Sequence, residues 1–345
     1  MISIICPIYN EEKYIDGFIR SILQQDYPKD DMEVLLVDGM STDRTRDIVH
    51  SYSIKYPFIR LVDNTARIVP PAMNIGIHAS KGDVIIRMDA HAIFPADYLS
   101  ELVVNLSKLN ADNVGGVCRT LPANDSDVGI SIANVLGSSF GMGNSYFRIG
   151  AKDVMQVDTV PFGCFHRELF NRIGFFDEEL VRNQDDEFNG RIIKNGGKIY
   201  LLPHLVIDYF ARDTVGKVYR MFNQYGLFKP LVNVKLGSPA TVRQFFPLAF
   251  VLGLLSCPFI IFTMFVLPWS WARITAFSLL TAYLFVIALY FLLATYFSLK
   301  DTKSIRRILI QDWVYFVVHF GYGFGYLQGL FNLLFSKKFM ANVNR

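Results

Sequence analysis

Charged residues are nearly absent from three long stretches in the last third of the sequence. Residues 245–268 and 274–299 contain none, and residues 308–335 contain only Asp312 and His319 as ionisable groups. Each stretch is longer than the roughly 20 apolar residues that cross a bilayer as a helix. The lack of charge therefore excludes a purely soluble protein, and we expect an integral membrane protein.

Cysteine is scarce, and its spacing excludes two classes of site. Cys6, Cys118, Cys164 and Cys257 stand far apart, without the spacing of a metal site or a disulfide framework. We therefore expect reduced thiols in a domain that faces the cytosol. The first residues form a predicted strand rather than a basic segment before an apolar run, so no cleavable signal peptide is expected.

A basic surplus of the kind that indicates nucleic-acid binding is also absent. The net charge is +3, and the eight basic and two acidic residues after Arg243 divide it into +6 beyond that position and −3 before it. Positive charge beside apolar segments is typical of membrane flanks. We therefore expect a membrane as a partner and no nucleic acid.

The first 115 residues alternate between short apolar strands and helices. Buried strands are predicted at residues 2–7, 34–37, 59–62 and 84–88, with helices around 14–23 and at 43–56 and 71–79. Fully apolar strands alternating with helices indicate an α/β domain with a mostly parallel, Rossmann-like sheet covered on both faces. Further helices are predicted near Asp185 and, as an aromatic amphipathic helix at the membrane interface, at 215–228.

Polar clusters follow three of these strands at the carboxyl ends, where parallel sheets bind their ligands. The clusters are residues 9–11, residues 38–43, and Asp89 with His91. Residues two apart on an extended strand share one face, so the Asp89 carboxylate and the His91 imidazole can meet one divalent cation. A capping aspartate and a surface histidine are the alternative, but the shared position of the clusters favours an active site.

Four motifs occur in a consistent order along the chain: CPIYNEEKYI from Cys6, VDGMSTDRT from Val37, RMDAH from Arg87 and NQDDEFNGR from Asn183. Together they resemble family 2 glycosyltransferases, which are inverting enzymes of the GT-A fold that use nucleotide-diphosphate sugars. The resemblance covers about residues 1–230. With its apolar C-terminal region, the chain is most similar to the succinoglycan-type glucosyltransferases that extend lipid-linked sugars.

The resemblance implies a donor site, with a UDP-sugar as the expected substrate. The matched nucleotide-binding residues are Pro7, Tyr9, Glu11, Asp38, Arg67, Asn74 with its neighbour Gly76, and Asp89. Arg67 can equally be a solvated loop charge. Asp89 and His91 stand in place of the DxD metal site of the family, whose metal stabilises the departing diphosphate. The imidazole is expected to favour Mn²⁺ over Mg²⁺.

The resemblance also implies a general base. Asp185 matches the carboxylate that deprotonates the acceptor hydroxyl, and Gln184 replaces an acid that is usual in the family. A helix N-terminus, where acids are favoured by the dipole, is the alternative. The implied acceptor-side residues are Phe162, Gly163, Arg167, Arg182, Glu187 and Arg191. Arg167 and Arg182 can equally form structural ion pairs. His204 and Asp208 are possible further metal ligands, with a core or edge role as the alternative.

Two domains follow from these patterns: a GT-A domain at 1–230, with a nucleotide-sugar part to about 115, and a membrane region at 231–345. Its candidate helices are the three charge-poor stretches. The basic loop at residues 300–307 is expected in the cytosol. A third crossing would place Lys337, Lys338 and Arg345 outside, and the glycines of GYGFGYLQG allow a re-entrant or interfacial segment instead. Two and three crossings both stay open, and Asp312 and His319 suggest functional or interhelical contacts.

The sequence thus predicts a glycosyltransferase in the inner (cytoplasmic) membrane, with its catalytic domain in the cytoplasm. The expected acceptor is a polyprenyl-diphosphate-linked glycan in bacterial exopolysaccharide or capsule assembly. The QxxRW motif of processive synthases is absent after Gln224, which favours the addition of one sugar. A polyprenyl-phosphate glycosyltransferase and a non-enzymatic membrane scaffold with a degenerate sugar-nucleotide domain are the alternatives.

Overall fold

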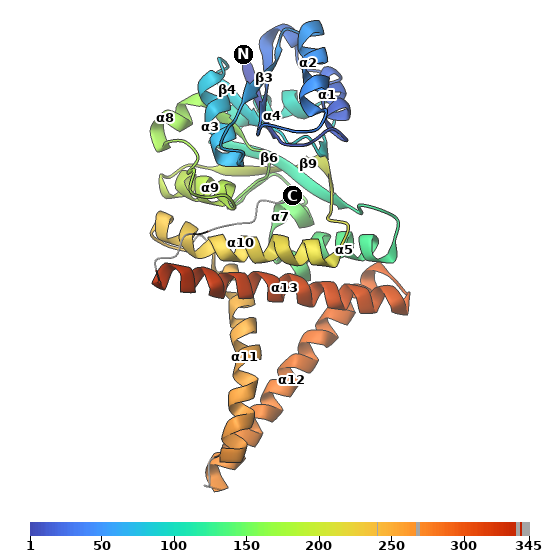
Figure 1. Cartoon of the computed structure of the whole chain (residues 1–345), viewed down its shortest axis with the longest axis vertical. Coiled ribbons are helices and arrows are strands. Elements are labelled where there is room, and N and C mark those ends of the chain that lie inside the picture. Colours follow the sequence, from blue (N-terminus) through green and yellow to red (C-terminus); the bar gives the residue numbers. More distant parts are fainter. Residues whose placement is uncertain (240, 267–269, 336–338, 340–345) are drawn as a thin grey trace.

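The computed structural model describes residues 1–239, 241–266, 270–335 and 339 (Figure 1). Lys337, Lys338 and Arg345, on which the argument about a third crossing depends, lie outside the described residues, as does Pro268 at the end of the first candidate membrane helix.

One mixed sheet forms the centre of the N-terminal domain. Within the described residues its strands follow the order β3-β2-β1-β4-β8-β6-β9-β5, with β7 paired to β9. The bounds are β1 Ile2–Ile8, β2 Met32–Asp38, β3 Ile59–Asp63, β4 Val84–Arg87, β5 Ala92–Ile93, β6 Asn113–Leu121, β7 Met155–Gln156, β8 Cys164–His166 and β9 Ile199–Phe210. The four predicted strands are β1 to β4 and pair in parallel. Strands β5, β7 and β8 join antiparallel.

Helices cover both faces of this sheet. The helices α1 (Ile15–Leu23), α2 (Thr45–Lys55) and α4 (Tyr98–Lys108) pack on one face, and α3 (Val69–Ala79), α8 (Arg167–Ile173) and α9 (Gln184–Lys194) on the other. Strand β1 shows why its sequence is apolar throughout: Ile4 contributes to the first core and Ile5 to the second. Successive side chains of a strand point to opposite faces, so a doubly covered strand needs apolar residues at both.

The C-terminal helices are arranged as a platform and a hairpin. Helices α10 (Val215–Leu236) and α13 (Ile305–Leu334) lie side by side beneath the sheet domain, and α11 (Phe245–Val266) and α12 (Ser270–Asp301) extend away from them (Figure 1). The predicted domain boundary at residue 230 falls inside α10. We call α10 and α13 the platform, and α11 and α12 the hairpin.

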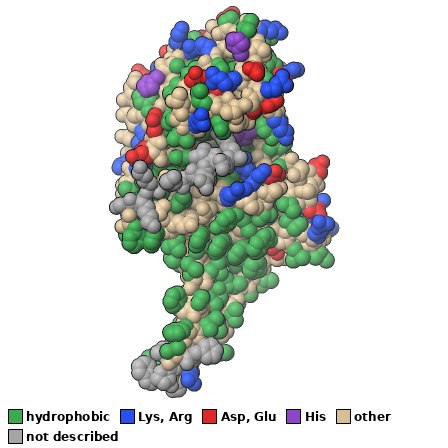
Figure 2. Space-filling view, in the orientation of Figure 1, with side chains coloured by type: hydrophobic (Ala, Val, Ile, Leu, Met, Phe, Trp, Pro, Cys, Tyr) green, Lys and Arg blue, Asp and Glu red, His purple; other side chains and the backbone are tan. Residues whose placement is uncertain are grey.

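Two segments of the hairpin are long and apolar enough to cross a membrane. Among the described residues they are Val242–Thr263 and Arg273–Asp301. Hydrophobic side chains cover the hairpin in Figure 2, whereas charged side chains gather over the sheet domain. The third charge-poor stretch is different, because α13 runs across the hairpin rather than along it (Figure 1). Among the described residues, the candidate crossings are therefore the two hairpin helices.

The glycines of α13 do not interrupt the helix, which runs continuously from Ile305 to Leu334. They allow two helix backbones to approach. A Cβ at Gly325 would lie 2.0 Å from the carbonyl oxygen of Asn223 on α10, and one at Gly329 would lie 2.3 Å from that of Leu227. On α10, a Cβ at Gly226 would lie 2.0 Å from the Tyr322 carbonyl oxygen. Close packing of two backbones requires residues without side chains.

Short helices between β6 and β7 join the sheet domain to the platform. They are α5 (Asp127–Gly137), α6 (Ser139–Met142) and α7 (Tyr146–Ile149). At one end of α5, Asp127 accepts a hydrogen bond from Arg307 of α13 at 2.7 Å. After its other end, the Ser138 hydroxyl accepts one from Tyr315 at 2.8 Å. These contacts fix α13 to the catalytic side of the molecule.

Candidate active site

A cleft of about 1320 Å³ runs from the carboxyl ends of β1 and β4 down to the platform and the hairpin. Its donor end, as we call the part under the strand ends, is lined by Tyr9, Asn10, Glu11, Asp89, His91 and Asp185. Its membrane end is lined by Phe246, Pro247, Phe250, Tyr290, His319 and Tyr322. One continuous cleft thus connects the predicted catalytic residues with the apolar hairpin.

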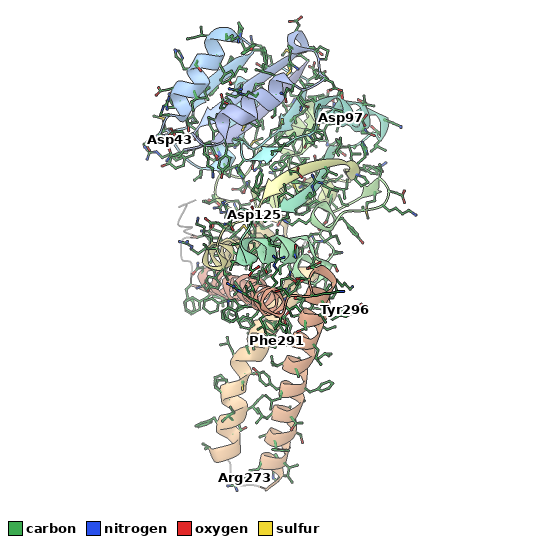
Figure 3. All side chains as sticks on the ribbon, turned by 90° about the vertical axis from the view of Figure 1, so that its right-hand side faces the viewer. Asp43, Asp97, Asp125, Arg273, Phe291 and Tyr296 are labelled. Carbon is green, nitrogen blue, oxygen red and sulfur yellow. The ribbon has the colours of Figure 1, made fainter. Side chains whose placement is uncertain are left out.

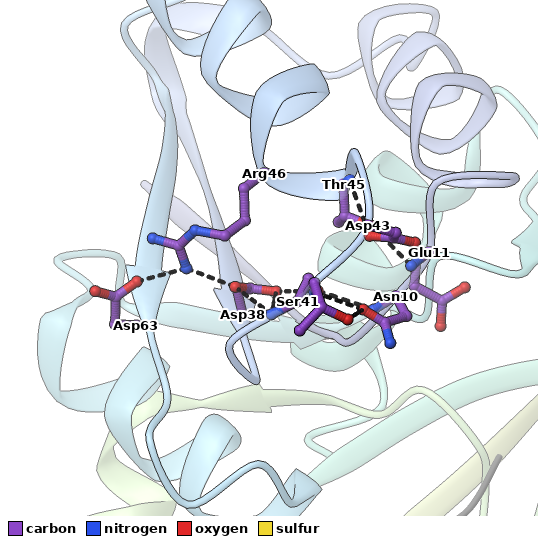
Figure 4. Close-up of polar contacts among 9 residues, drawn as sticks. Asn10, Glu11, Asp38, Ser41, Asp43, Thr45, Arg46 and Asp63 are labelled. Carbon is purple, nitrogen blue, oxygen red and sulfur yellow. Dashed lines mark hydrogen bonds and ion pairs between the residues drawn. The ribbon is translucent and has the colours of Figure 1, made fainter.

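The loops after β1 and β2 are fastened to each other at the donor end (Figure 4). The Asn10 amide donates to the Ser41 hydroxyl at 2.8 Å, and the Asn10 side-chain oxygen accepts from the Thr42 amide at 2.8 Å. The Glu11 amide donates to the Thr45 hydroxyl at 2.8 Å. Asn10 adopts a left-handed conformation with φ of 53°, which asparagine tolerates better than most residues. The sharp turn brings Tyr9 and Glu11 to the cleft.

Asp38 lies beneath these loops and is fully buried. Its carboxylate accepts hydrogen bonds from the Ser41 hydroxyl and from Arg46, both at 2.5 Å, and Arg46 also pairs with Asp63 at 2.8 Å (Figure 4). Asp43 closes the same turn, because it accepts from the amide of Thr45 at 3.0 Å. The expected hydrogen bond from Asp38 to a nucleotide base or ribose stays a prediction.

Three predicted nucleotide-binding residues meet beside this turn. Pro7, Tyr9 and Arg67 line a small adjoining pocket together with Gly39 and Asn64. A Cβ at Gly39 would lie 3.3 Å from the Tyr9 ring and 3.4 Å from the Arg67 Cα, so the glycine permits the close approach of these segments. The structure therefore brings together residues that the sequence separates by some 60 positions.

Asp89 and His91 follow β4 and both line the cleft. The Asp89 carboxylate accepts from the Arg87 guanidinium at 3.2 and 3.3 Å. Nδ1 of His91 lies 3.7 Å from Oε1 of Glu11, and its ring packs edge-on against Tyr209 with 5.7 Å between ring centroids. The short distance between strand end and first loop places the His91 imidazole beside the Glu11 carboxylate in the cleft.

No three His, Cys, Asp or Glu side chains in the described part of the chain are close enough to hold a metal ion by themselves. Asp89 and His91 nevertheless fit a divalent ion that takes its remaining ligands from substrate phosphates and water, as magnesium-type sites at phosphates commonly do. An imidazole beside a carboxylate is a donor set that suits a transition metal such as Mn²⁺. The ion would neutralise charge on the diphosphate.

Asp185 begins α9 and lines the same cleft. The residue before that helix, Asn183, has a left-handed conformation with φ of 61°, and its side-chain amide donates to the Tyr225 carbonyl of α10 at 2.8 Å. Burial raises the pKa of Asp185, the neighbouring Asp186 raises it further, and Arg87 opposes both. A higher pKa makes the carboxylate a stronger base.

Comparisons with known proteins decide the family. The model described as "Glycosyl transferase family 2" matches residues 3–174. A dolichyl N-acetyl-alpha-D-glucosaminyl phosphate 3-beta-D-2,3-diacetamido-2,3-dideoxy-beta-D-glucuronosyltransferase of Methanococcus voltae is 34% identical over 263 residues, which cover 74% of this chain and 80% of the relative. This chain belongs to glycosyltransferase family 2. The expected family and the expected enzymatic activity are thereby confirmed.

Two further known proteins are similar to this glycosyltransferase. The succinoglycan biosynthesis protein ExoA of Rhizobium meliloti (strain 1021) is 27% identical over 248 residues, covering 71% of this chain and 74% of ExoA. The solved structure of the mannosyltransferase PcManGT from Pyrobaculum calidifontis, in complex with GDP-Man and Mn²⁺, superposes with a TM-score of 0.59 at 21% identity, covering 96% of this chain and 87% of that one. The latter confirms the GT-A fold.

Four of the predicted site residues of the glycosyltransferase have structural roles instead. Asn74 is buried outside the cleft, where its side chain donates to the Phe176 carbonyl and to Glu178 and accepts from the Phe176 amide. The neighbouring Gly76 packs against β1, since a Cβ there would lie 2.5 Å from Ile5. The expected nucleotide contact of Asn74 is therefore corrected: its amide fixes α3 to the loop before α9.

Arg167, Glu187 and Arg191 are corrected for the same reason. Arg167 donates to the carbonyl oxygens of Gly82 and Ile77 and to the Ser80 hydroxyl, on the side of β4 opposite the cleft. Glu187 and Arg191 form an ion pair at 2.6 Å, and this arginine also donates to two backbone carbonyls after α8. The hydrogen-bonding capacity of these side chains is used within the fold, so none is placed to meet an acceptor.

The other candidates divide between cleft and surface. Phe162 and Arg182 line the cleft, and Arg182 donates to Gln224 at 2.9 Å. Gly163 is buried beside Phe162, where its carbonyl accepts from the Arg87 amide. The acceptor roles of these three stay predictions. His204 pairs with Glu101 and Asp208 pairs with Arg119, so the edge role weighed against metal binding is the one observed.

The two ionisable groups of α13 contact neighbouring elements. Asp312 accepts from the Thr295 and Ser298 hydroxyls of α12 at 2.6 and 2.7 Å. Nε2 of His319 donates to the Phe140 carbonyl at 3.0 Å, and Nδ1 accepts from the Tyr290 hydroxyl at 2.8 Å. The contacts are interhelical, as one of the two interpretations expected.

Sequence reasoning missed several basic residues that line the cleft. Among them are Arg87, Arg148, Lys229 and Arg243. Arg87 stands in the RMDAH motif and could have been found there. The other three come from α7, α10 and the segment before α11, whose meeting at one cleft has no sequence signal.

Proposed function

We propose that the glycosyltransferase moves one sugar from a nucleotide-diphosphate sugar, with UDP-sugar as the expected donor, to a saccharide carried on a polyprenyl phosphate or diphosphate. The observation that carries this proposal is the continuity of the cleft from Asp89, His91 and Asp185 to the apolar hairpin. A lipid-linked saccharide has its sugar hydroxyl and its lipid at opposite ends, and the cleft offers polar and apolar surroundings in that order. The name of the Methanococcus relative, which acts on a dolichyl N-acetyl-alpha-D-glucosaminyl phosphate, supports this acceptor class.

The geometry suits an inverting displacement. The donor diphosphate would lie against Asp89 and His91, and the metal bound there would stabilise the negative charge of the leaving nucleoside diphosphate. The acceptor hydroxyl would attack the anomeric carbon from the opposite side, and Asp185 would accept its proton. The C–O bond to the acceptor forms as the C–O bond to the diphosphate breaks. General base catalysis of this kind contributes roughly 10²- to 10⁴-fold.

The same proposal places the enzyme in the inner (cytoplasmic) membrane, with the hairpin across the bilayer and the platform at its surface. The basic residues Lys300, Lys303, Arg306 and Arg307 stand where α12 ends and α13 begins. Arg306 and Arg307 lie 3.3 and 2.7 Å from Asp127 of the sheet domain. By the positive-inside rule, this charge supports a cytoplasmic position for the junction and with it for the catalytic domain. The opposite end, near Arg273, would lie across the bilayer (Figure 3).

The test uses the full chain in lipid nanodiscs with Mn²⁺, a panel of UDP- and GDP-sugars, and three synthetic acceptors. The acceptors are a polyprenyl phosphate, a polyprenyl-phosphate sugar and a polyprenyl-diphosphate sugar. We expect release of nucleoside diphosphate only with a sugar-bearing acceptor, and a loss of roughly 10²- to 10⁴-fold in Asp185→Asn. Asp177→Asn, which removes an acid outside the cleft, is the matched control for charge removal.

Other results would change the assignment. Transfer to polyprenyl phosphate itself, with activity largely retained in Asp185→Asn, would indicate a polyprenyl-phosphate glycosyltransferase, because an ionised phosphate needs no base. Absence of both turnover and nucleotide-sugar binding by calorimetry would contradict an enzymatic role and favour a membrane scaffold.

A further inference from the structure

Arg148 lines the cleft without an acid beside it, unlike three other basic residues of the lining. Lys229 pairs with Asp186 at 2.7 Å, Arg243 with Asp158 at 2.6 Å, and Arg87 with Asp89 at 3.2 Å. Among the described residues, no carboxylate lies within ion-pair distance of Arg148. The cleft therefore contains a guanidinium whose charge the protein itself does not neutralise.

The side chain of Arg148 is nevertheless held in place. Its Cζ lies 5.5 Å from the ring centroid of Phe147 and 5.4 Å from that of Tyr209, which is the range of cation–π contacts. Its Nη1 donates to the Thr120 hydroxyl at 3.4 Å, a long hydrogen bond. A guanidinium carries five N–H donors. Within the described part of the chain, only the N–H that bonds to Thr120 has a side-chain acceptor. Aromatic contacts thus fix the group and leave donors for a ligand.

The position of Arg148 relates it to both ends of the cleft. Tyr209, on which it packs, also packs against His91 at the donor end. The segment that carries Arg148 also carries Phe140, whose ring contacts Tyr290 and His319 at the membrane end. Gly143 and Gly150, both with positive φ, flank the shorter stretch around Arg148. Arg148 therefore stands along the path that a donor diphosphate and a lipid-linked acceptor would share.

We propose that Arg148 binds a phosphate group of a substrate, either the phosphate that joins the acceptor saccharide to its lipid or the diphosphate of the donor. This proposal rests on the proposed function for its substrates. A planar guanidinium recognises phosphate through two parallel N–H···O bonds, which an ammonium group cannot reproduce. A half-buried cation without a counter-ion is costly to the folded protein, and an anionic ligand would offset that cost.

The test compares Arg148→Gln and Arg148→Lys with the wild type as full chains in nanodiscs. One arm measures the KM for the lipid-linked acceptor, and the other measures the Kd of UDP and GDP with Mn²⁺ by calorimetry. Arg172→Gln is the matched control, because Arg172 of α8 pairs with Asp112, outside the cleft. We expect Arg148→Gln to weaken one arm roughly 10- to 100-fold, the range for a charged hydrogen-bonded contact, and Arg148→Lys to recover only part of it.

The two arms separate the sources of the phosphate. A raised acceptor KM with an unchanged nucleotide Kd assigns Arg148 to the lipid phosphate, and the reverse assigns it to the donor diphosphate. Unchanged values in both arms would overturn the proposal. Equal losses in both arms with a lowered unfolding temperature that lysine does not restore would make Arg148 a structural residue. If the wild type transfers no sugar, the proposed function fails, while the calorimetric arm still decides whether Arg148 contacts a nucleotide diphosphate.

Discussion

Asp185 stands among charges that act on its pKa in opposite directions. Burial and Asp186 raise this pKa, and Arg87 lowers it. Asp186 does not act alone, because its carboxylate pairs at 2.7 Å with Lys229. The same stretch is tied to α10 by Arg182 and Asn183, through Gln224 and the Tyr225 carbonyl. The segment that carries the proposed base is thus attached to the platform helix α10 through one ion pair and two hydrogen bonds.

Removal of Lys229 should move the pH profile of the enzyme. In Lys229→Met the charge of Asp186 is no longer compensated, so ionisation of Asp185 is less favourable and its pKa rises further. The acid limb of kcat/KM, where activity falls as Asp185 is protonated, should therefore shift to higher pH. Measurement of kcat/KM across the acid range with saturating metal would show it.

Three matched variants make this prediction specific. Lys229→Arg keeps the positive charge, so the acid limb of kcat/KM should stay at its wild-type pH. The double variant Lys229→Met with Asp186→Asn removes both charges and should also return the acid limb to that pH. Lys235→Met removes a lysine of the same helix that pairs with Asp177 and Glu179 outside the cleft. If Lys235→Met shifts the limb as much as Lys229→Met, the ion pair with Asp186 is not the cause.

At the scale of elements, backbone contact between α10 and α13 decides how the platform is built. The three glycines Gly321, Gly325 and Gly329 are spaced by four residues, so they lie on one face of α13. Gly323 lies on another face, where a Cβ would be 2.0 Å from the Pro247 carbonyl of α11. Gly321 and Gly325 therefore allow α10 to approach α13, and Gly323 between them allows α11 to approach.

Gly325→Ala should destabilise the platform, because the added Cβ would be 2.0 Å from the Asn223 carbonyl and the helices would have to separate. Overpacking of this kind costs about 1–3 kcal/mol. Gly17→Ala in α1 is the control, since a Cβ there has nothing within 4 Å and alanine favours a helix by up to about 1 kcal/mol. Thermal unfolding in nanodiscs should show opposite shifts, and a neutral Gly325→Ala would contradict the close packing.

Asn74→Ala tests the corrected role of that residue. Its three hydrogen bonds to Phe176 and Glu178 join α3 to the loop before α9, so their loss should cost about 1–3 kcal/mol of folding free energy. The Kd of nucleotide diphosphate should stay near the wild-type value. A large rise in that Kd without a loss of stability would restore the nucleotide contact expected from the family.

At the scale of the whole molecule, an aromatic row on α13 faces the same side as the hairpin. Trp313, Phe316, Phe320 and Phe324 stack in sequence with centroid distances of 5.3, 5.5 and 5.7 Å. Phe316 also contacts Phe250 and Phe291, which belong to the two hairpin helices. Aromatic side chains are enriched at membrane–water interfaces. The row fits a platform that lies along the bilayer surface.

The fluorescence of Trp313 can report how deeply α13 lies in the bilayer. In a variant with Trp269→Phe and Trp271→Phe it is the remaining tryptophan of the three in the chain. Its fluorescence should be quenched more by lipids brominated near the carbonyl groups than by lipids brominated near the chain ends. Stronger quenching from the chain ends would mean that α13 crosses the bilayer, and the arrangement with two crossings would be wrong.

The sequence determined the elements whose signals are local. Strands β1 to β4 and the helices between them follow from apolar runs and helical periodicity, and Asp89, His91 and Asp185 follow from motifs at strand and helix ends. The course of α13 could not be read, because glycine in a helix has the same sequence signal whether it breaks the helix or admits a neighbour. Asn74, Arg167 and Arg191 were misassigned because a motif match does not reveal which groups a side chain forms hydrogen bonds with.

Only the tertiary structure decided how the cleft is completed. Lys229, Arg243 and Arg148 come from segments up to about a hundred residues apart and meet where the sheet domain rests on the platform. A charged residue has no periodicity and no preferred spacing to a partner that is distant in sequence. The sequence pattern therefore does not predict that these three side chains lie in one cleft. Burial and backbone packing are set locally by residue type, whereas the pairing of charges depends on which surfaces the finished fold brings together.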